Sequence, residues 1–302
     1  MTVVVIGVAM VDIAYQVERL PRSGETMLAR ERTVDVGGKG LNQALIAHRA
    51  GAAVRFCAGF GSDPGAAIIR ARLEAEGLST AWLVPVPRAS DESIVYVART
   101  GENCIVSTVD AARHLTPAGI AGMLAGVTSG DVLLVQGNLS REVTGICLTR
   151  ARAAAATTIL NPAPVDFDYT DLWPMVDIAI LNQIEAHTLT GEVEIDAASA
   201  VLCSQGASRV VLTLGPQGAL VREGPAPPQR IPAPAVAAVD TTGAGDVVAG
   251  VVAAGIDRGL PLGPVVRWAV AAATQKVTRR GTSSAFPTSA ELAALGRAMD
   301  LP

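Results

Sequence analysis

Two carboxylates bracket a turn of small residues near the end of the chain, in the stretch DTTGAGD that runs from Asp240 to Asp246. An apolar run rich in Ala, Val and Gly follows at once, which predicts that a helix begins within the stretch. The backbone amides of Gly243, Ala244 and Gly245 can approach a ligand closely because these side chains are minimal. With the positive end of the helix dipole behind them, these amides would suit a phosphate group.

Asp246 would stand at the mouth of this turn. A carboxylate repels phosphate, but it is well suited to take a proton from a hydroxyl that attacks a phosphate. We therefore predict that Asp246 is a general base and that Gly243, Ala244 and Gly245 form the anion hole beside it. Asp240 is expected to organise the loop or an ion. Taken alone, the motif is equally consistent with an N-cap Asp beside a tight turn.

A second glycine-rich stretch, VDVGGKGLNQA at residues 34–44, lies at the predicted start of another helix. It is not a P-loop, because Thr33 stands at the place of that motif's first glycine and Gly40 follows the lysine where Ser or Thr is required. Gly38 lets the backbone approach a polar substrate closely, while Lys39 and Asn42 offer donors to hydroxyl groups. The alternative is a glycine-rich loop that only caps the helix.

The elements that must position these motifs alternate between short β-rich runs and Ala/Leu-rich helical stretches. Strands are predicted at residues 3–6, 54–58, 132–136, 158–160, 178–181 and 210–214, and helices at residues 42–50, 65–76 and 141–156. Continuous apolar strands separated by helices indicate a parallel sheet that is covered on both faces. In such sheets, ligands bind beyond the carboxyl ends of the strands.

Two segments, residues 13–36 and 91–108, do not follow this alternation of apolar strands and helices. They show polar/apolar alternation and turn signals at Pro21, Gly24 and Gly101. We therefore predict that they form a small antiparallel sheet that stands off the main body. The Pro- and Gly-rich residues 223–235 are predicted to be a hairpin and loop, and not a domain boundary.

One further glycine motif, GFGSDPG at residues 59–65, follows a predicted strand as a dinucleotide-binding motif does. Its third glycine lies one residue too far along the chain, Asp63 would crowd a pyrophosphate, and Pro64 has no amide donor. The sequence therefore argues against a dinucleotide cofactor.

Composition limits the class of protein further. The chain has 302 residues, of which 50% are apolar and 17% charged, and its net charge is −4. This acidic balance argues against nucleic acid or an anionic membrane as the main partner. The four cysteines lie far apart, and no apolar run approaches the roughly 20 residues needed to cross a bilayer. We expect a cytoplasmic globular enzyme or binding protein with reduced cysteines.

Together, these motifs give the chain a resemblance to the PfkB carbohydrate kinase family, and within it to the ribokinase-like members. GGKGLNQA and VDTTGAGD match the two signatures of the family, and LPRSGET, GEN, LNPAP, NQIEAHTLTG and TLGPQG also fall in the expected order. The resemblance implies an α/β fold with one domain over residues 1–302. This would be a ribokinase-like three-layer αβα body with a mostly parallel central sheet, and a small β-sheet lid made by the two segments described above. It also implies phosphoryl transfer from Mg-ATP to a sugar hydroxyl.

The resemblance further assigns roles to individual residues. Asp246 would be the catalytic base beside the anion hole, and sugar hydroxyls would be bound by Asp12, Gly38, Lys39 and Asn42. The ATP phosphates and their magnesium ion would lie near Asn182 and Glu185, and the nucleotide would contact Gly245, Thr213, Gly215 and Gly218. A monovalent cation such as potassium would be held, mostly by backbone carbonyls, near Asp240, Thr242, Lys276, Arg279 and Gly281.

The chain departs from the ribokinase pattern at three positions. Met10 stands where an Asn is usual and Asn138 where a Glu is usual, and both positions help to hold ribose. These changes reduce the hydrogen bonding that a ribose pocket needs, so the identity of the sugar or polyol acceptor is open. Ala285 replaces a Ser near the cation site, where Ser283 or Ser284 can substitute, so dependence on potassium is also open.

Other functions stay as alternatives. A kinase for a nucleoside would need apolar contacts for the base, which Met10 and Tyr15 can supply. A non-catalytic sugar-binding regulator is disfavoured by the intact Asp246, and a hydrolase by the lack of a GxSxG motif and of metal-ligand spacing among the histidines. The exposed edge of the small sheet is expected to support a homodimer.

Overall fold

An eight-stranded sheet forms the centre of the molecule in the computed structural model, which describes residues 1–100 and 102–301. Six neighbouring strands pair in parallel, as predicted, and two antiparallel strands extend one edge. In spatial order the strands are β14 (Gln229–Ile231), β13 (Ala219–Glu223), β12 (Arg209–Thr213), β11 (Ile178–Asn182), β10 (Thr157–Asn161), β9 (Val132–Gln136), β1 (Val3–Ile6) and β4 (Val54–Cys57).

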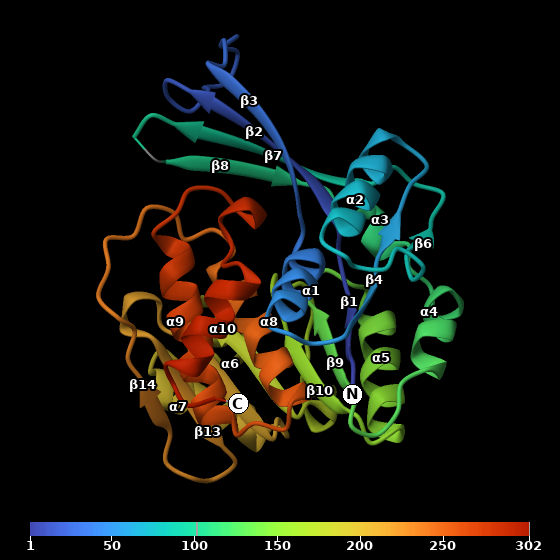
Figure 1. The fold of residues 1–302 in the computed structure, drawn as a ribbon, viewed down its shortest axis with the longest axis vertical. Helices are drawn as coiled ribbons and strands as arrows, with labels where there is room; N and C mark the ends of the chain where they lie inside the picture. Colours follow the sequence, from blue (N-terminus) through green and yellow to red (C-terminus); the bar gives the residue numbers. More distant parts are fainter. Residues whose placement is uncertain (101, 302) are drawn as a thin grey trace.

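Helices cover both faces of this sheet (Figure 1). In β1, Val3 and Val5 pack into one apolar cluster, whereas Val4 and Ile6 pack into the other, because successive strand side chains point to opposite faces. The first cluster is completed by α1 (Lys39–Arg49), α2 (Pro64–Ala75), α8 (Ala244–Asp257), α9 (Leu262–Val277) and α10 (Ser289–Arg297). The second is completed by α4 (Pro117–Ala125), α5 (Arg141–Ala153), α6 (Gln183–Thr190) and α7 (Ile195–Ser204). The predicted three-layer αβα architecture is confirmed.

Shorter elements join these layers. They are a parallel pair of strands, β5 (Gly59–Phe60) with β6 (Val84–Pro85), the helix α3 (Asp110–Arg113), and the 3₁₀ turns η1 (Trp173–Met175), η2 (Gly215–Gln217) and η3 (Ser283–Ala285). No helix among the described residues combines the length and the apolar character that a bilayer crossing requires.

A second sheet of four strands stands over the carboxyl ends of the large sheet (Figure 1). Its spatial order is β3 (Glu31–Gly37), β2 (Met10–Val17), β7 (Asp91–Ala98) and β8 (Asn103–Ser107). The two predicted segments each form an antiparallel hairpin, but β2 and β7 at the centre run parallel, so the prediction of an antiparallel sheet is wrong for this pair. Both strands leave the body in the same direction, which makes their pairing parallel. The predicted turn residue Gly101 lies outside the described residues.

Two helix ends differ by three residues from the predicted bounds, each for a local reason. Helix α1 begins three residues early, because Gly38 adopts a φ of 93° as its N-cap and the amide of Leu41 donates to the carbonyl of Val8 at 3.1 Å. Helix α5 ends three residues early, because Ala155 lies in the left-handed region with a φ of 56°. The early start of α1 brings Lys39 and Asn42 onto its first turn.

Candidate functional site

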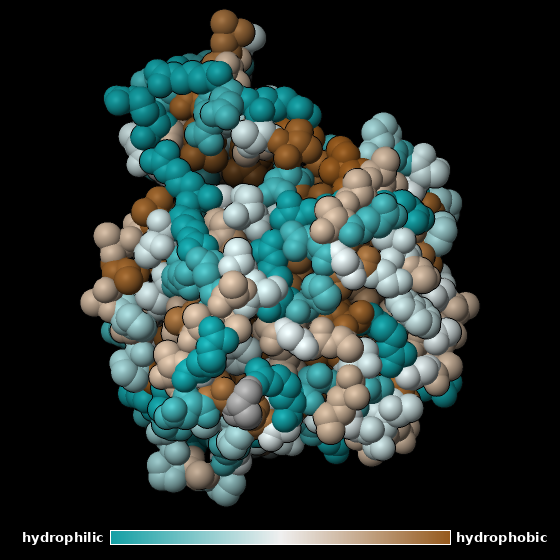
Figure 2. Space-filling model, viewed as in Figure 1, coloured by the Kyte–Doolittle hydropathy of each residue, from teal (hydrophilic) through white to brown (hydrophobic). Residues whose placement is uncertain are grey.

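A cleft of about 1720 Å³ lies between the small sheet and the carboxyl ends of the large one. Figure 2 shows the small sheet overhanging the body, with apolar surface in the hollow beneath it. The cleft brings together, from the residues predicted from sequence, Met10, Asp12, Gly38, Lys39, Asn42, Asn138, Asp240, Thr242, Gly243, Asp246 and Gly281. The other predicted residues do not line it: Ala244, Gly245, Asn182, Glu185, Thr213, Gly215, Gly218, Lys276 and Arg279.

Asp246 lies in the first turn of α8 and is only 4% exposed. Its Oδ2 accepts a hydrogen bond from Asn42 Nδ2 at 2.9 Å, and its Oδ1 accepts one from Gln43 Nε2 at 3.0 Å. Both donors lie on the first turns of α1. An ionised carboxylate has about four acceptor positions, so these two bonds fix its orientation and leave capacity for a hydroxyl in the cleft.

An amide chain that the sequence reasoning missed supports this carboxylate from below. Gln43 Nε2 also donates to Asn161 Oδ1 at 3.0 Å, and Gln136 Nε2 donates to Gln43 Oε1 at 2.8 Å. Asn161 in turn donates to the carbonyl of Ile180 at 2.9 Å. The sequence held one hint of this chain of amides: Gln136 and Asn161 are polar residues at the carboxyl ends of the buried strands β9 and β10.

Two buried acceptors in the cleft have no hydrogen-bond partner among the described residues. They are Oδ1 of Asn42, a residue that is 4% exposed, and Oδ1 of Asn138, a residue that is 7% exposed. A buried polar atom without a partner is costly, so a ligand donor that reached either amide from the cleft would remove this cost. Sugar hydroxyls are donors of this kind.

Asp12 enters the cleft from β2 and lies directly opposite Asp35 on β3. Burial raises the pKa of Asp12 to about 7, with further contributions from the charges of Asp35 and Asp246. Gly37 makes room for this carboxyl group, because a Cβ atom there would lie 2.1 Å from Asp12 Oδ2. The arrangement holds a second carboxyl group in the same cleft as Asp246.

The N-terminus of α8 lies where the sequence predicts an anion hole. Gly243 caps the helix with a φ of 78°, and a Cβ atom there would lie 2.9 Å from the ring of Phe286. Gly245 faces open space, with nothing within 4 Å of an added Cβ atom. The first amides of a helix lack partners within the helix and carry its positive dipole end, so this surface suits an anion.

The residues predicted for the nucleotide lie along the same carboxyl edge, beyond the lining of the cleft. Asn182 and Thr213 end the neighbouring strands β11 and β12 and pair in register. Asn182 and Glu185 form a capping box at the start of α6, with both reciprocal hydrogen bonds at 2.8 Å. Burial raises the pKa of Glu185, and Asp246 adds to this, while the amide of Asn182 and the charge of Lys39 oppose it.

The two glycines of the predicted nucleotide loop have structural reasons to be glycine. Gly215 and Gly218 adopt φ values of 57° and 92° in the turn between β12 and β13. A Cβ atom on Gly218 would lie 2.0 Å from the carbonyl oxygen of Ile231. The conformation of the turn therefore depends on both positions.

Asp240 organises the loop before α8. Its Oδ1 accepts from the amide of Thr242 at 2.9 Å, and its Oδ2 accepts from the amide of Gly281 at 3.0 Å. The side chain of Lys276 reaches the same loop, where Nζ donates to the carbonyl oxygen of Asp240 at 2.9 Å. The Arg279 side chain instead pairs with Glu291 on α10.

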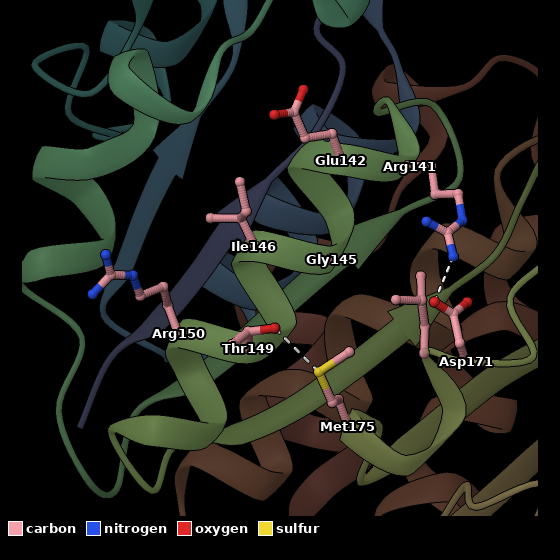
Figure 3. Close-up of a pocket in the computed structure, with 9 residues that line it drawn as sticks. Arg141, Glu142, Gly145, Ile146, Thr149, Arg150, Asp171 and Met175 are labelled. Carbon is pink, nitrogen blue, oxygen red and sulfur yellow. Dashed lines mark hydrogen bonds and ion pairs between the residues drawn. The ribbon is translucent and has the colours of Figure 1, made fainter.

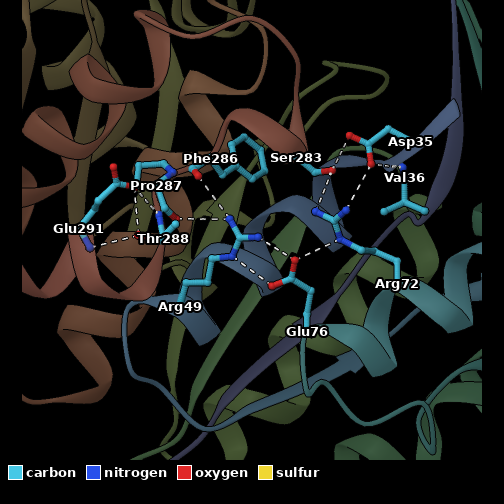
Figure 4. Close-up of polar contacts among 10 residues, drawn as sticks. All are labelled: Asp35, Val36, Arg49, Arg72, Glu76, Ser283, Phe286, Pro287, Thr288 and Glu291. Atoms are coloured by element: carbon cyan, nitrogen blue, oxygen red, sulfur yellow. Dashed lines mark hydrogen bonds and ion pairs between the residues drawn. The ribbon is translucent and has the colours of Figure 1, made fainter. Parts of the chain in front are cut away.

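A polar network ties the base of the small sheet to the loop after α9 (Figure 4). Ser283 Oγ donates to Asp35 Oδ2 at 3.0 Å, and Arg72 Nη1 lies 3.5 Å from Asp35 Oδ1. Arg72 and Arg49 both pair with Glu76, at 3.1 and 2.7 Å. The Ser283 hydroxyl is therefore committed to the small sheet, whereas Ser284 lines the cleft.

A second hollow of about 370 Å³ lies on the outer surface of α5 and η1, away from these residues (Figure 3). Two pairs of its lining residues contact each other: Arg141 pairs with Asp171, and the hydroxyl of Thr149 donates to the sulfur of Met175 at 3.2 Å. It holds none of the residues predicted to do chemistry.

The cleft offers little for an aromatic base. In the part of the chain that the structure describes, no Phe, Tyr or Trp lines it, although Met10 does. Tyr15 stacks on Tyr96 at a centroid distance of 6.0 Å, and neither residue lines the cleft. Under the alternative of a nucleoside kinase, Met10 can therefore contact a base from the cleft lining, whereas Tyr15 cannot in this arrangement.

The sequence is similar to those of known carbohydrate kinases. The model of the pfkB family of carbohydrate kinases matches residues 1–289. A ribokinase of Haemophilus influenzae is 31% identical over 96% of this chain and 96% of its own length, and a deoxyribokinase of Salmonella typhi is 29% identical over 95% and 96%.

Solved structures agree with this match. A ribokinase of Thermotoga maritima superposes with a TM-score of 0.89 at 27% identity, covering 98% of this chain and 99% of that one. An Arabidopsis thaliana ribokinase complexed with ribose and ATP superposes with a TM-score of 0.88 at 26% identity, covering 97% and 98%. With its two signature motifs meeting at one cleft under a small sheet, the chain belongs to the pfkB family of carbohydrate kinases.

Proposed function

We propose that this carbohydrate kinase uses Asp246 as the base that activates a sugar hydroxyl for attack on the γ-phosphate of ATP. The observation that carries the proposal is the position of Asp246, which opens into the cleft at the N-terminus of α8 with both oxygens oriented by Asn42 and Gln43. One side of this carboxylate thus meets the acceptor, and the amides beside it meet the phosphate.

The reaction follows from this arrangement. Asp12, Asn42 and Asn138 orient the acceptor by hydrogen bonds to its hydroxyl groups. As the acceptor oxygen attacks the γ-phosphorus, its O–H bond breaks and the proton passes to Asp246. The bond between phosphorus and the bridging oxygen breaks, and ADP leaves with that electron pair. The amides at the start of α8 stabilise the charge on the transferred group, so catalysis rests on positioning and electrostatics.

The nucleotide would lie along the edge marked by Asn182, Thr213 and the turn at Gly215 and Gly218. A magnesium ion bound with ATP would neutralise part of the phosphate charge, and the protein would need to offer it only one or two carboxylates. Glu185 fits this limited role, because it is a partly buried carboxyl group whose pKa responds to the charges of Lys39 and Asp246.

The small sheet would act as a lid that excludes water. Residues from all four of its strands line the cleft, which supports closure over the acceptor. Its outer strand β8 also carries Val106, which is 63% exposed, so we propose a homodimer through this sheet. The need for ATP supports a cytoplasmic location.

The acceptor should be a sugar that presents an apolar carbon to Met10. The thioether of Met10 offers hardly any hydrogen bonding, so a hydroxyl against it would lose its partner. Asn138 carries one unpartnered acceptor atom and lines the same cleft. These two positions favour a pentose with fewer hydroxyl groups than ribose. The described residues that line the cleft include no aromatic side chain, which disfavours nucleosides.

The experiment is a phosphoryl-transfer screen with Mg-ATP against ribose, 2-deoxyribose, hexoses and nucleosides, read by mass spectrometry of the phosphorylated product. We expect a sugar phosphate, with a higher kcat/KM for a deoxypentose than for ribose. Transfer to nucleosides alone, or no transfer with any acceptor while ATP binds, would contradict the proposal. The Asp196→Asn variant, changed at an exposed ion pair with Arg230, is the matched control and should retain full activity.

A further inference from the structure

Lys276 is a fully buried lysine in the last turn of α9, with no exposed surface. Buried lysines are rare unless their charge is paired. Its Nζ donates to the carbonyl oxygen of Asp240 at 2.9 Å and lies 3.8 Å from Asp240 Oδ1. The ammonium group is therefore surrounded by the oxygens of one loop residue, at the negatively polarised end of a helix.

This loop is the place where the family resemblance puts a dissociable monovalent cation. The residues present do not fit such an ion. The Asp240 carbonyl already accepts from Lys276, and both Asp240 carboxylate oxygens accept from backbone amides. The Ser283 hydroxyl is committed to Asp35. A second positive charge beside the ammonium group would also be repelled.

We propose that the ammonium group of Lys276 is a built-in cation of the loop before α8, and that this chain needs no potassium or other monovalent cation. The loop leads directly from Asp240 to Gly243 and Asp246. A tethered positive charge there orders the loop and adds a fixed positive charge behind the anion hole. Lys276 is accordingly a positioning residue, because it acts on the reacting groups through Asp240.

The charge balance of the pair supports this role. Burial would raise the pKa of Asp240, but the hydrogen bonds from Thr242, the charge of Lys276 and the amide of Gly281 bring it below its ordinary value. Burial lowers the pKa of Lys276, and the charge and hydrogen bond of Asp240 oppose this. The two side chains thus stabilise each other's ionised form.

A binding measurement tests the proposal without any assay of the reaction. Crystals of the wild-type protein are soaked in rubidium chloride, and anomalous scattering is measured at the loop. We expect no rubidium within coordinating distance of Asp240 in the wild type. In Lys276→Ala, where the side chain no longer fills the site, we expect a rubidium peak there. A rubidium ion on Asp240 in the wild type would overturn the proposal.

A second arm measures Tm and activity at constant ionic strength in potassium chloride and in tetramethylammonium chloride. For the wild type we expect the same Tm and kcat in both salts, whereas a potassium-specific gain of about tenfold in kcat, which is 1.36 kcal/mol in transition-state free energy, would overturn the proposal. For Lys276→Ala we expect potassium to raise both quantities. Lys276→Met, which keeps the volume but not the charge, should have a lower kcat that potassium does not restore.

Arg267→Ala is the matched control, because it removes an exposed positive charge from the same helix. It should respond to neither salt. The activity arm rests on the proposed function, but the rubidium and Tm arms do not. A protein without sugar kinase activity that still excludes rubidium from Asp240 would refute the proposed reaction and leave the built-in cation standing.

Discussion

At the scale of single residues, the resemblance carried by the two signature motifs predicted that Asp246 and Asn42 share one site, and the two side chains do meet in one cleft. Gln43 and Gln136 were missed, although Gln43 contacts Asp246 directly. Their contact joins positions 93 residues apart, and it exists only because α1 packs over the end of β9. A motif read along the chain does not contain that information.

The second carboxyl group of the cleft leads to a pH prediction. The pKa of Asp12 is raised to about 7, first by burial and then by Asp35 and Asp246. Hydroxyl donors favour the ionised form of a carboxyl group, so we expect the KM for the sugar to fall as pH rises from roughly 6 to roughly 8. The profile of KM against pH measures this directly.

Two variants test whether titration of Asp12 causes the pH dependence of KM. Asp12→Asn should raise KM and remove the pH dependence, and Asp35→Asn should move the dependence to lower pH by removing one charge. A pH dependence that survives in Asp12→Asn would assign it to another group. The same pKa shift also makes folding stability depend on pH. Between pH 3.8 and about 7 the folded protein holds a proton that the unfolded chain has released, so this group's contribution to stability falls as pH rises.

At the scale of elements, the six parallel strands of the large sheet were predicted to within one residue at each end, because each is a short, largely apolar run. The antiparallel strands β13 and β14 were not predicted individually, because they lie in and beside a Pro- and Gly-rich stretch. The parallel pairing of β2 with β7 was not predicted. Polar/apolar alternation shows which side chains share a face of a strand, but it does not show which strand lies alongside or in which direction that strand runs. The crossing of α1 over α8 was also beyond prediction. It depends on Gly250, whose added Cβ atom would lie 2.7 Å from both the Gln43 carbonyl oxygen and Ile46.

This crossing positions Asp246 against Asn42 and Gln43, which gives a prediction for the helix pair. Gly250→Ala should push α8 away from α1 and lower the free energy of unfolding by about 1–3 kcal/mol. It should also lower kcat, because the carboxylate loses the amides that orient it. Urea unfolding and steady-state kinetics measure the two effects.

The matched control lies in α4. Gly122 is exposed, and an added Cβ atom there would meet nothing within 4 Å. Gly122→Ala should therefore raise stability by about 0.5–1 kcal/mol through helix propensity and leave kcat unchanged. Equal destabilisation by the two substitutions would show that the contact between α1 and α8 is not the reason for Gly250.

At the scale of the whole molecule, the small sheet stands over the cleft and also packs on the body through α2, α3 and η3 (Figure 1). The body buries its strands between helical layers, whereas β8 ends the small sheet as an exposed edge strand. Exposed edges invite pairing with another chain. Composition alone predicted a cytoplasmic globular protein, but it contained nothing about which edge is left uncovered.

We therefore expect a homodimer, with a mass in sedimentation equilibrium of twice the 30.9 kDa of the chain. Val106→Glu places a charge on the proposed contact and should give a monomer. Val193→Glu, at a position that is 77% exposed between α6 and α7, should remain a dimer. A wild-type protein that sediments as a monomer at all concentrations would exclude contact through the small sheet.

The most direct test of the whole account is the Asp246→Asn variant, measured for ligand binding by calorimetry and for turnover in the same preparation. The amide keeps the size of the side chain but cannot take the proton from the acceptor. We predict that ATP and sugar bind nearly as in the wild type while kcat falls by about 10² to 10⁴, the range for loss of a general base. A variant that binds both ligands and turns over at the wild-type rate would contradict the account.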